Sequence, residues 1–180
     1  MASAPTGWTD EGELDLSGVG KGPPPPPEEG VYEAIIDEAM AAGTKPDANG
    51  KSKPAFSLTL TLDRAFNNAE GSMKRKIFDK IVLTQAAAFR LVQLCDAVEV
   101  PKLTKTAMSA VEEFCGDLVG KRVWIRLKHE TNASYNSGKP TAKVGAYLTA
   151  AEAAIVASGG DPYADAADAP VRRGRATAAE

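Results

Sequence analysis

The segment from Phe56 to Asp63 alternates apolar and polar residues without interruption. Its apolar set is Phe56, Leu58, Leu60 and Leu62, and its polar set is Ser57, Thr59, Thr61 and Asp63. Because successive side chains of a β-strand point to opposite faces, this period of two predicts a strand with one buried face and one face in water. A single strand is not stable in water, so the chain must supply further strands with the same kind of apolar face.

Four other segments have strand patterns, namely residues 31–38, 73–83, 121–129 and 141–148. In 73–83 we expect Met73, Arg75, Ile77 and Ile81 on one face and Lys74, Lys76, Phe78 and Lys80 on the other. In 121–129 we expect Val123, Ile125 and Leu127 inside and Arg122, Trp124, Arg126 and Lys128 outside. In 141–148 we expect Val144, Ala146 and Leu148 opposite Lys143, Gly145 and Tyr147. Each strand therefore offers one face to a common core.

Between the third and fourth strands the apolar residues recur with a helical period. Thr84 is a good N-cap residue, and the residues after it predict an amphipathic helix over 85–97. The inward set of this helix is Phe89, Leu91, Val92, Leu94, Cys95 and Val98. Pro101 ends the segment. A second, weaker helix is expected over residues 104–115 with Ala107, Val111, Phe114 and Cys115 inside, and a third, alanine-rich helix over residues 149–157.

This order of elements predicts the fold class. Three strands, two helices and two strands are the layout of an OB-type fold, a five-stranded Greek-key barrel with a helical insert between strands 3 and 4. A closed barrel would bury the apolar face of every strand inside. Another α+β sheet with the same element order is the alternative, because a sequence does not reveal which strands pair. The chain is thus expected to be mainly β, with the OB-type domain over residues 30–150.

Both ends of the chain have a different composition. Residues 1–29 hold six acidic residues and one lysine and include five consecutive prolines at 23–27, so we expect a disordered acidic, proline-rich arm. Residues 151–180 are expected to form a short helix followed by a disordered tail. The net charge is −3, yet residues 30–160 contain 17 basic and 14 acidic residues, so the centre of the chain is mildly basic.

The outward faces of the third and fourth strands carry the functional hypothesis. Each places an aromatic ring among cations, and bases stack on rings while cations contact phosphates, so we expect sequence-tolerant binding of single-stranded DNA. The strand residues expected to bind nucleic acid are Lys74, Lys76, Phe78, Lys80, Arg122, Trp124, Arg126 and Lys128. The loops add Lys45, Lys51, Lys53 and Tyr135. Two alternatives stay open, since the following helix could cover Phe78, and a tail or a partner could cover Trp124.

Enzymatic function is not expected. The chain has one histidine, His129, and no recognisable nucleophile motif, glycine-rich phosphate loop or carboxylate cluster, so we expect no catalytic residues, no cofactor and no metal site. Cys95 and Cys115 are expected to be reduced core residues. No signal peptide or membrane-spanning run is apparent, which favours a cytoplasmic protein. The alternative function is a non-catalytic assembly or host-inhibiting protein that uses the same barrel to bind protein.

Three stretches carry a resemblance to a known family. They are Gly-Val-Tyr-Glu-Ala-Ile-Ile at 30–36, Phe-Arg-Leu-Val-Gln-Leu at 89–94 and Leu-Val-Gly-Lys-Arg-Val-Trp at 118–124. The chain resembles the small single-stranded DNA-binding proteins of bacteriophages and prophages, which implies an OB-fold and a role in DNA replication or recombination in the host cytoplasm. Many such proteins end in an acidic tip, whereas this chain ends in a basic segment at Arg172–Arg175. Replication or recombination partners are therefore expected at the acidic N-terminal arm, which could instead compete with DNA, and self-association stays open.

Overall fold

The described structure is a single five-stranded antiparallel sheet with three α-helices. A computed structural model describes residues 25–67, 73–131 and 139–162. The strands are β1 (Gly30–Gly43), β2 (Pro54–Ala65), β3 (Arg75–Val82), β4 (Arg122–Glu130) and β5 (Thr141–Leu148). The helices are α1 (Ala88–Val98), preceded by a 3₁₀ turn at Gln85–Ala87, α2 (Met108–Leu118) and α3 (Ala150–Ala157). The predicted five-stranded sheet with helices between its third and fourth strands is confirmed.

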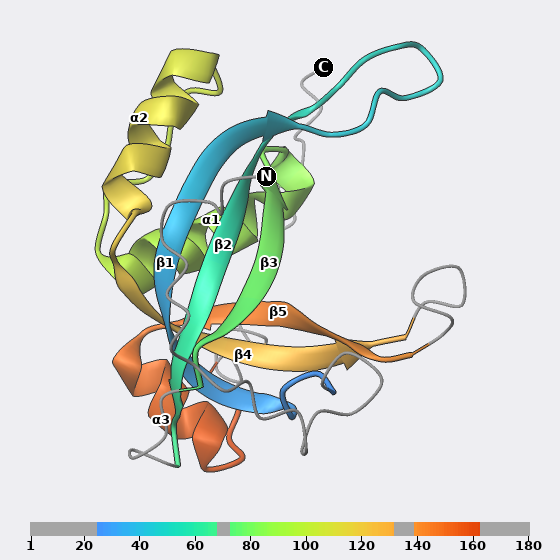
Figure 1. Ribbon diagram of the computed structural model, residues 1–180. Helices are drawn as coiled ribbons and strands as arrows, with labels where there is room; N and C mark the ends of the chain where they lie inside the picture. Colours follow the sequence, from blue (N-terminus) through green and yellow to red (C-terminus); the bar gives the residue numbers. More distant parts are fainter. Residues whose placement is uncertain (1–24, 68–72, 132–138, 163–180) are drawn as a thin grey trace, which may run out of the picture.

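The long central strand β1 organises the sheet. The strand order is β3-β2-β1-β4-β5, and every neighbouring pair is antiparallel. The first half of β1 pairs with β4, and register shifts at Glu33/Ala34 and Ile36/Glu38 interrupt its pairing with β2. Such irregularities bend a strand and increase its twist. As a result, β4 and β5 run across the direction of β1, β2 and β3 (Figure 1).

The sheet is not closed by backbone pairing. Its two edges are β3 and β5, and no backbone ladder joins them in the part of the chain that the structure describes. The bend of β1 nevertheless brings the two edges close enough for side chains to bridge them. The Tyr147 hydroxyl on β5 donates to the Asp79 carboxylate on β3 at 2.6 Å. We call this side-chain-bridged junction the β3–β5 seam.

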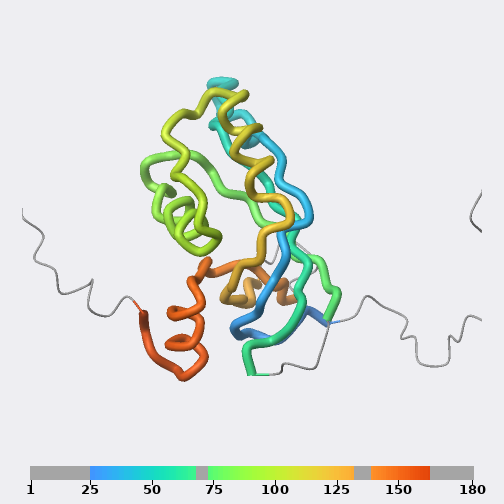
Figure 2. Tube along the Cα trace, turned by 90° about the vertical axis from the view of Figure 1, so that its left-hand side faces the viewer, coloured from blue at the N-terminus to red at the C-terminus, as the bar shows by residue number. Residues whose placement is uncertain are grey.

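The main core lies between the inner face of the sheet and helices α1 and α2. The alternating leucines of β2, together with Ile77, Ile81 and the apolar residues of β4, are almost completely buried. Leu94 and Val98 from α1 and Val111, Phe114 and Leu118 from α2 pack on them. Figure 2 shows α1 and α2 at one end of the molecule and α3 at the other. The inner faces predicted for the second, third and fourth strands are confirmed.

The helices differ from the sequence predictions in the bounds of α2 and in three residues expected inside, since Phe89, Val92 and Ala107 are exposed. Helix α2 starts and ends later than residues 104–115, because Leu118 continues the buried series Val111, Phe114 and Cys115 at helical spacing. Gly116 therefore lies inside the helix, and the chain leaves it near Gly120, which has a φ of +81°. Phe89 was expected inside but is 59% exposed, because the first turn of α1 directs Arg90 rather than Phe89 toward the sheet.

The faces predicted for β5 were correct at Val144 but wrong for Ala146, Tyr147 and Leu148. Val144 and Tyr147 point into the main core, whereas Ala146 and Leu148 point to the opposite side. The reason is a register shift in the β4–β5 pairing, where Arg126 pairs with Ala146 and Leu127 with Val144. Gly145 is the extra residue on β5, so the alternation reverses there. A simple period of two along the sequence places Tyr147 on the wrong face.

Cys95 and Cys115 are both free and buried, as expected. Burial raises the pKa of each thiol above its usual value, which keeps the thiols protonated and unreactive. Among the described residues, no helix is long and apolar enough to cross a membrane.

Candidate nucleic-acid interface

The outer face of β3 is open to solvent. Lys74, Lys76, Phe78 and Lys80 are all exposed, as their alternation predicted. Phe78 is 72% exposed, which is more than any other large apolar side chain in the described part of the chain. The alternative in which the following helix covers this ring is therefore excluded. A planar ring held in water on a regular strand is a suitable surface for stacking.

Phe78 lies at the edge of a groove along the β3–β5 seam. The groove has a volume of about 410 Å³, and its lining residues are Ser57, Phe78, Asp79, Lys80, Arg90, Lys143 and Val144. We call it the seam groove. Three cationic residues, Lys80, Arg90 and Lys143, come from β3, α1 and β5 respectively. The seam groove thus combines an exposed aromatic ring with basic side chains from three separate elements.

Asp79 is the acidic residue of the seam groove, and its charge is compensated internally. Arg90 donates to the Asp79 carboxylate at 2.7 Å and to the Val144 carbonyl at 3.0 Å, which links α1 to both edges of the sheet. Tyr147 is fully buried, and its hydroxyl donates to the same carboxylate oxygen. Burial raises the pKa of Tyr147 well above its ordinary value, and the negative charge of Asp79 adds to this effect. The network holds the seam together without leaving Asp79 as a free anion.

The outer face of β4 differs from the prediction, because Trp124 is not openly exposed. It packs with Phe66, Ala146 and Val156 against a small second core of Val31, Leu148 and Ala153. The Phe66 ring meets the Trp124 ring edge-on at 5.2 Å, and the Arg64 guanidinium lies 5.6 Å from the Trp124 ring centroid. Helix α3, which follows β5 directly, supplies part of this cover. The expectation that Phe78 and Trp124 are exposed together is wrong.

Arg122, the first cation of β4, is engaged in ion pairs within the sheet. Its guanidinium donates to the Asp63 carboxylate at 2.7 Å and lies 3.5 Å from the Glu33 carboxylate. Asp63 is on β2, so Arg122 reaches across β1 to form this pair. The hydrogen bond to Asp63, together with the charge of Glu33, raises the pKa of the Arg122 side chain. Arg122 is thus less available to a phosphate than the sequence pattern indicated.

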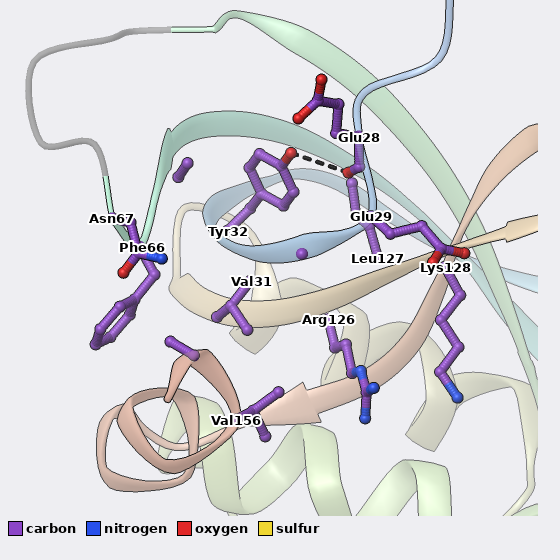
Figure 3. A pocket seen from close by; sticks show the side chains of 13 residues that line it. Glu28, Glu29, Val31, Tyr32, Phe66, Asn67, Arg126, Leu127, Lys128 and Val156 are labelled. Carbon is purple, nitrogen blue, oxygen red and sulfur yellow. Dashed lines mark hydrogen bonds between the residues drawn. The ribbon is translucent and has the colours of Figure 1, made fainter. Parts of the chain in front are cut away.

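Arg126 and Lys128, the other two cations of β4, are exposed beside a second groove. This groove has a volume of about 460 Å³ and also contains Glu28 and Glu29. We call it the β4 groove. Figure 3 shows that the Arg126 and Lys128 side chains extend to the same side, away from Glu28. Glu29 is occupied, because its carboxylate accepts a hydrogen bond of 2.6 Å from the backbone N–H of His129.

The β1–β2 loop is ordered by its own hydrogen bonds and carries three exposed lysines, Lys45, Lys51 and Lys53. The Asp47 carboxylate accepts from the backbone N–H groups of Asn49 and Lys51. The Lys80 ammonium donates to the Gly43 carbonyl at the base of this loop, so the loop begins next to the seam groove. Tyr135, the remaining predicted residue, lies outside the described residues.

Two residues of the seam groove, Arg90 and Lys143, were not predicted. Arg90 lies in a helix that was predicted from its apolar residues alone, and Lys143 is the only cation in the strand predicted over residues 141–148. A count of cations along each strand does not detect either of them, because they join Phe78 only through the folding of the sheet. Lys143 also pairs with Glu130 on the neighbouring strand.

Among the residues that the structure describes, no group of three or more His, Cys, Asp or Glu side chains is arranged to hold a metal ion. No family model matches this sequence, and no curated protein is significantly similar to it.

Proposed function

We propose that this protein is a non-catalytic, sequence-tolerant single-stranded DNA-binding protein. In this proposal the domain is an OB-type barrel in which the Asp79–Tyr147–Arg90 network takes the place of backbone pairing between β3 and β5. Its role is in phage-type DNA replication or recombination, as the resemblance of three sequence stretches implies. The single observation that carries the binding proposal is Phe78, exposed on a strand between Lys76 and Lys80 and beside the seam groove.

Leaving the Phe78 ring in water has a free-energy cost. An exposed aromatic ring on an ordered strand loses the burial that most aromatic residues gain. A base stacked on the ring would recover part of it, and Lys80 and Lys143 are placed to contact the flanking phosphates. Stacking does not depend on base identity, which is why the binding is expected to tolerate any sequence.

The alternative, a protein-binding function, has lost one of its supports. It assigned Trp124 to a partner, but Trp124 already packs against Phe66 and α3. The N-terminal arm and exposed apolar residues such as Phe89, Met40 and Met108 are its remaining candidates. Size-exclusion chromatography with and without an oligothymidine separates the two functions, because only the DNA-binding function predicts a complex with the oligomer alone.

The decisive experiment compares two exposed phenylalanines. Phe78→Ala should weaken binding of a labelled oligothymidine by about 5- to 150-fold, which corresponds to the roughly 1–3 kcal/mol of one base stack. Phe89→Ala is the matched control, since Phe89 is 59% exposed but does not line the seam groove. Fluorescence anisotropy at two salt concentrations measures both, with duplex DNA and RNA as competitors. Equal effects of the two substitutions, or no binding by the wild type, would rule out the proposal.

A further inference from the structure

Two lysines lie directly opposite each other on the β4–β5 hairpin. Lys128 of β4 is the cross-strand partner of Lys143 of β5, and both side chains are exposed. Like charges at such positions destabilise a sheet. Glu130 pairs with Lys143 and offsets part of this repulsion. Within the described residues, no ion pair is formed by Lys128, so one positive charge of the pair remains uncompensated.

Gly145 lets the Lys128 side chain lie flat across β5. A Cβ atom on Gly145 would lie 3.1 Å from both Cγ and Cδ of Lys128, which is too close for ordinary packing. The glycine is also the extra residue of the β5 bulge, so the same residue changes the register and makes room for the lysine stem. The Lys128 stem is therefore directed over β5 and toward the side of the sheet where Lys143 lies.

The lysine pair connects the two grooves of the molecule. Lys143 lines the seam groove with Phe78 and Lys80, and Lys128 lines the β4 groove with Arg126. Because Lys128 and Lys143 are neighbours across the strands, the cationic residues form one continuous path. The path starts at Lys80, crosses the seam to Lys143 and ends on β4 at Lys128 and Arg126.

The geometry points to Lys128 and Lys143 as a phosphodiester-binding pair that carries the strand from the seam groove onto β4. This inference rests on the proposed function, and it adds the direction in which the nucleic acid leaves Phe78. A phosphate between the two ammonium groups would relieve their mutual repulsion and displace Glu130 from Lys143. The ligand class is an anionic chain with regularly spaced phosphates, not a single small anion.

The test removes both charges and leaves polar, slightly shorter side chains in their place. Lys128→Gln/Lys143→Gln should weaken oligothymidine binding roughly 25-fold at about 0.1 M salt. It should also make the negative slope of log K against log salt shallower by about 1.4, because each phosphate contact on a single strand contributes about −0.7 to that slope. The matched control is Lys105→Gln/Lys121→Gln, which removes two exposed lysines outside both grooves. Glu130→Gln should strengthen binding, since it frees Lys143.

The outcomes separate the two proposals. If the wild type binds and Phe78→Ala weakens binding, but the Lys128/Lys143 variant has the salt slope of the control variant, then the path onto β4 is wrong while the function stands. If the wild type does not bind the oligomer, the function itself fails. Anisotropy titrations over several salt concentrations on all variants supply both results, and circular dichroism verifies that each variant is folded.

Discussion

The outer faces of β3 and β4 have the same sequence pattern but different structures. Each strand alternates cations with one aromatic residue, and each was expected to bind nucleic acid. On β3 the ring of Phe78 is exposed, and its neighbours Lys76 and Lys80 face the solvent with it. On β4 the ring of Trp124 is partly buried under α3 and Phe66, and the adjacent Arg122 is held by Asp63 and Glu33.

The difference follows from the position of each strand in the sheet. Strand β3 is an edge, and the chain leaves it toward α1, which packs on the inner side. Strand β4 lies between β1 and β5, and the chain after β5 turns back as α3 over its outer face. A row of alternating cations and an aromatic ring therefore indicates a binding surface only where no later element covers it. Trp124 therefore contributes to packing and stability, and Phe78 is the ring that we propose contacts DNA.

The largest expected effect is the loss of folding stability in the variant Trp124→Ala. Removing the indole leaves a cavity between Phe66, Leu148 and α3, and the free energy of unfolding should fall by about 2–4 kcal/mol. Oligothymidine affinity of the folded variant should change by less than about twofold, well below the effect of one lost base stack. Urea unfolding followed by circular dichroism measures the first quantity, and anisotropy the second.

Phe78→Ala should have the opposite effect to Trp124→Ala. The Phe78 ring is mostly in water, so its removal should change the free energy of unfolding by no more than about 0.5 kcal/mol. Together the two variants should show a crossed pattern, with stability lost in one and affinity in the other. An unchanged stability and a weakened affinity in Trp124→Ala would reverse the assignment and restore β4 as the stacking surface.

Much of the fold could be predicted from the sequence, because alternation is a local property. Leu58, Ile77 and Ile125 are buried as their strand patterns indicated. The change of side-chain alternation at Gly145 could not be predicted. A bulge arises from the register with the partner strand, which the sequence of the bulged strand alone does not show. The order of strands and helices along the chain was predicted, but strand pairing was not. The seam depends on Tyr147, whose hydroxyl meets Asp79 across 68 residues of sequence.

The candidate site was predicted less completely than the fold, for the same reason. Exposure of Phe78 and Lys76 follows from strand period, and it was predicted correctly. Cover over Trp124 depends on where α3 packs. The sequence predicted an alanine-rich helix over residues 149–157 but not the surface against which it packs. The arrival of Arg90 and Lys143 beside Phe78 is a tertiary effect that no local pattern contains.

The next largest expected effect on stability concerns the β3–β5 seam, where Tyr147 on β5 donates a hydrogen bond to Asp79 on β3. Tyr147→Phe removes a hydrogen bond from a buried hydroxyl to a carboxylate, which should lower the free energy of unfolding by about 1.5–3 kcal/mol. Tyr32→Phe is the matched control, because the Tyr32 hydroxyl donates to the neutral Glu28 carbonyl and its loss should cost only about 0.5–1.5 kcal/mol. Urea unfolding at neutral pH measures both variants. A smaller loss for Tyr147→Phe than for Tyr32→Phe would contradict the role assigned to the seam.

The same variant predicts a pH dependence. The pKa of Tyr147 is raised in the folded state above its ordinary value of 10.0, so the folded protein holds this proton more tightly than the unfolded chain. The contribution of Tyr147 is therefore fully present below about pH 10 and is lost as the pH rises above it, by at most about 1.4 kcal/mol per pH unit. Unfolding free energies between neutral pH and pH 11 should fall more steeply in the wild type than in Tyr147→Phe. Parallel curves would mean that Tyr147 ionises equally easily in both states.

The smallest expected effect compares one cation from each strand, Lys76 of β3 and Arg122 of β4. Lys76→Gln should make the negative slope of log K against log salt for oligothymidine shallower by about 0.7, the contribution of one phosphate contact on a single strand. Arg122→Gln should leave this slope nearly unchanged, because the guanidinium already donates to Asp63 and lies beside Glu33. Both variants remove one positive charge, so any effect of net charge alone is the same in the two titrations. If Arg122→Gln makes the slope as shallow as Lys76→Gln does, DNA must displace Asp63 from Arg122. The first residues of β4 then belong to the binding surface together with β3.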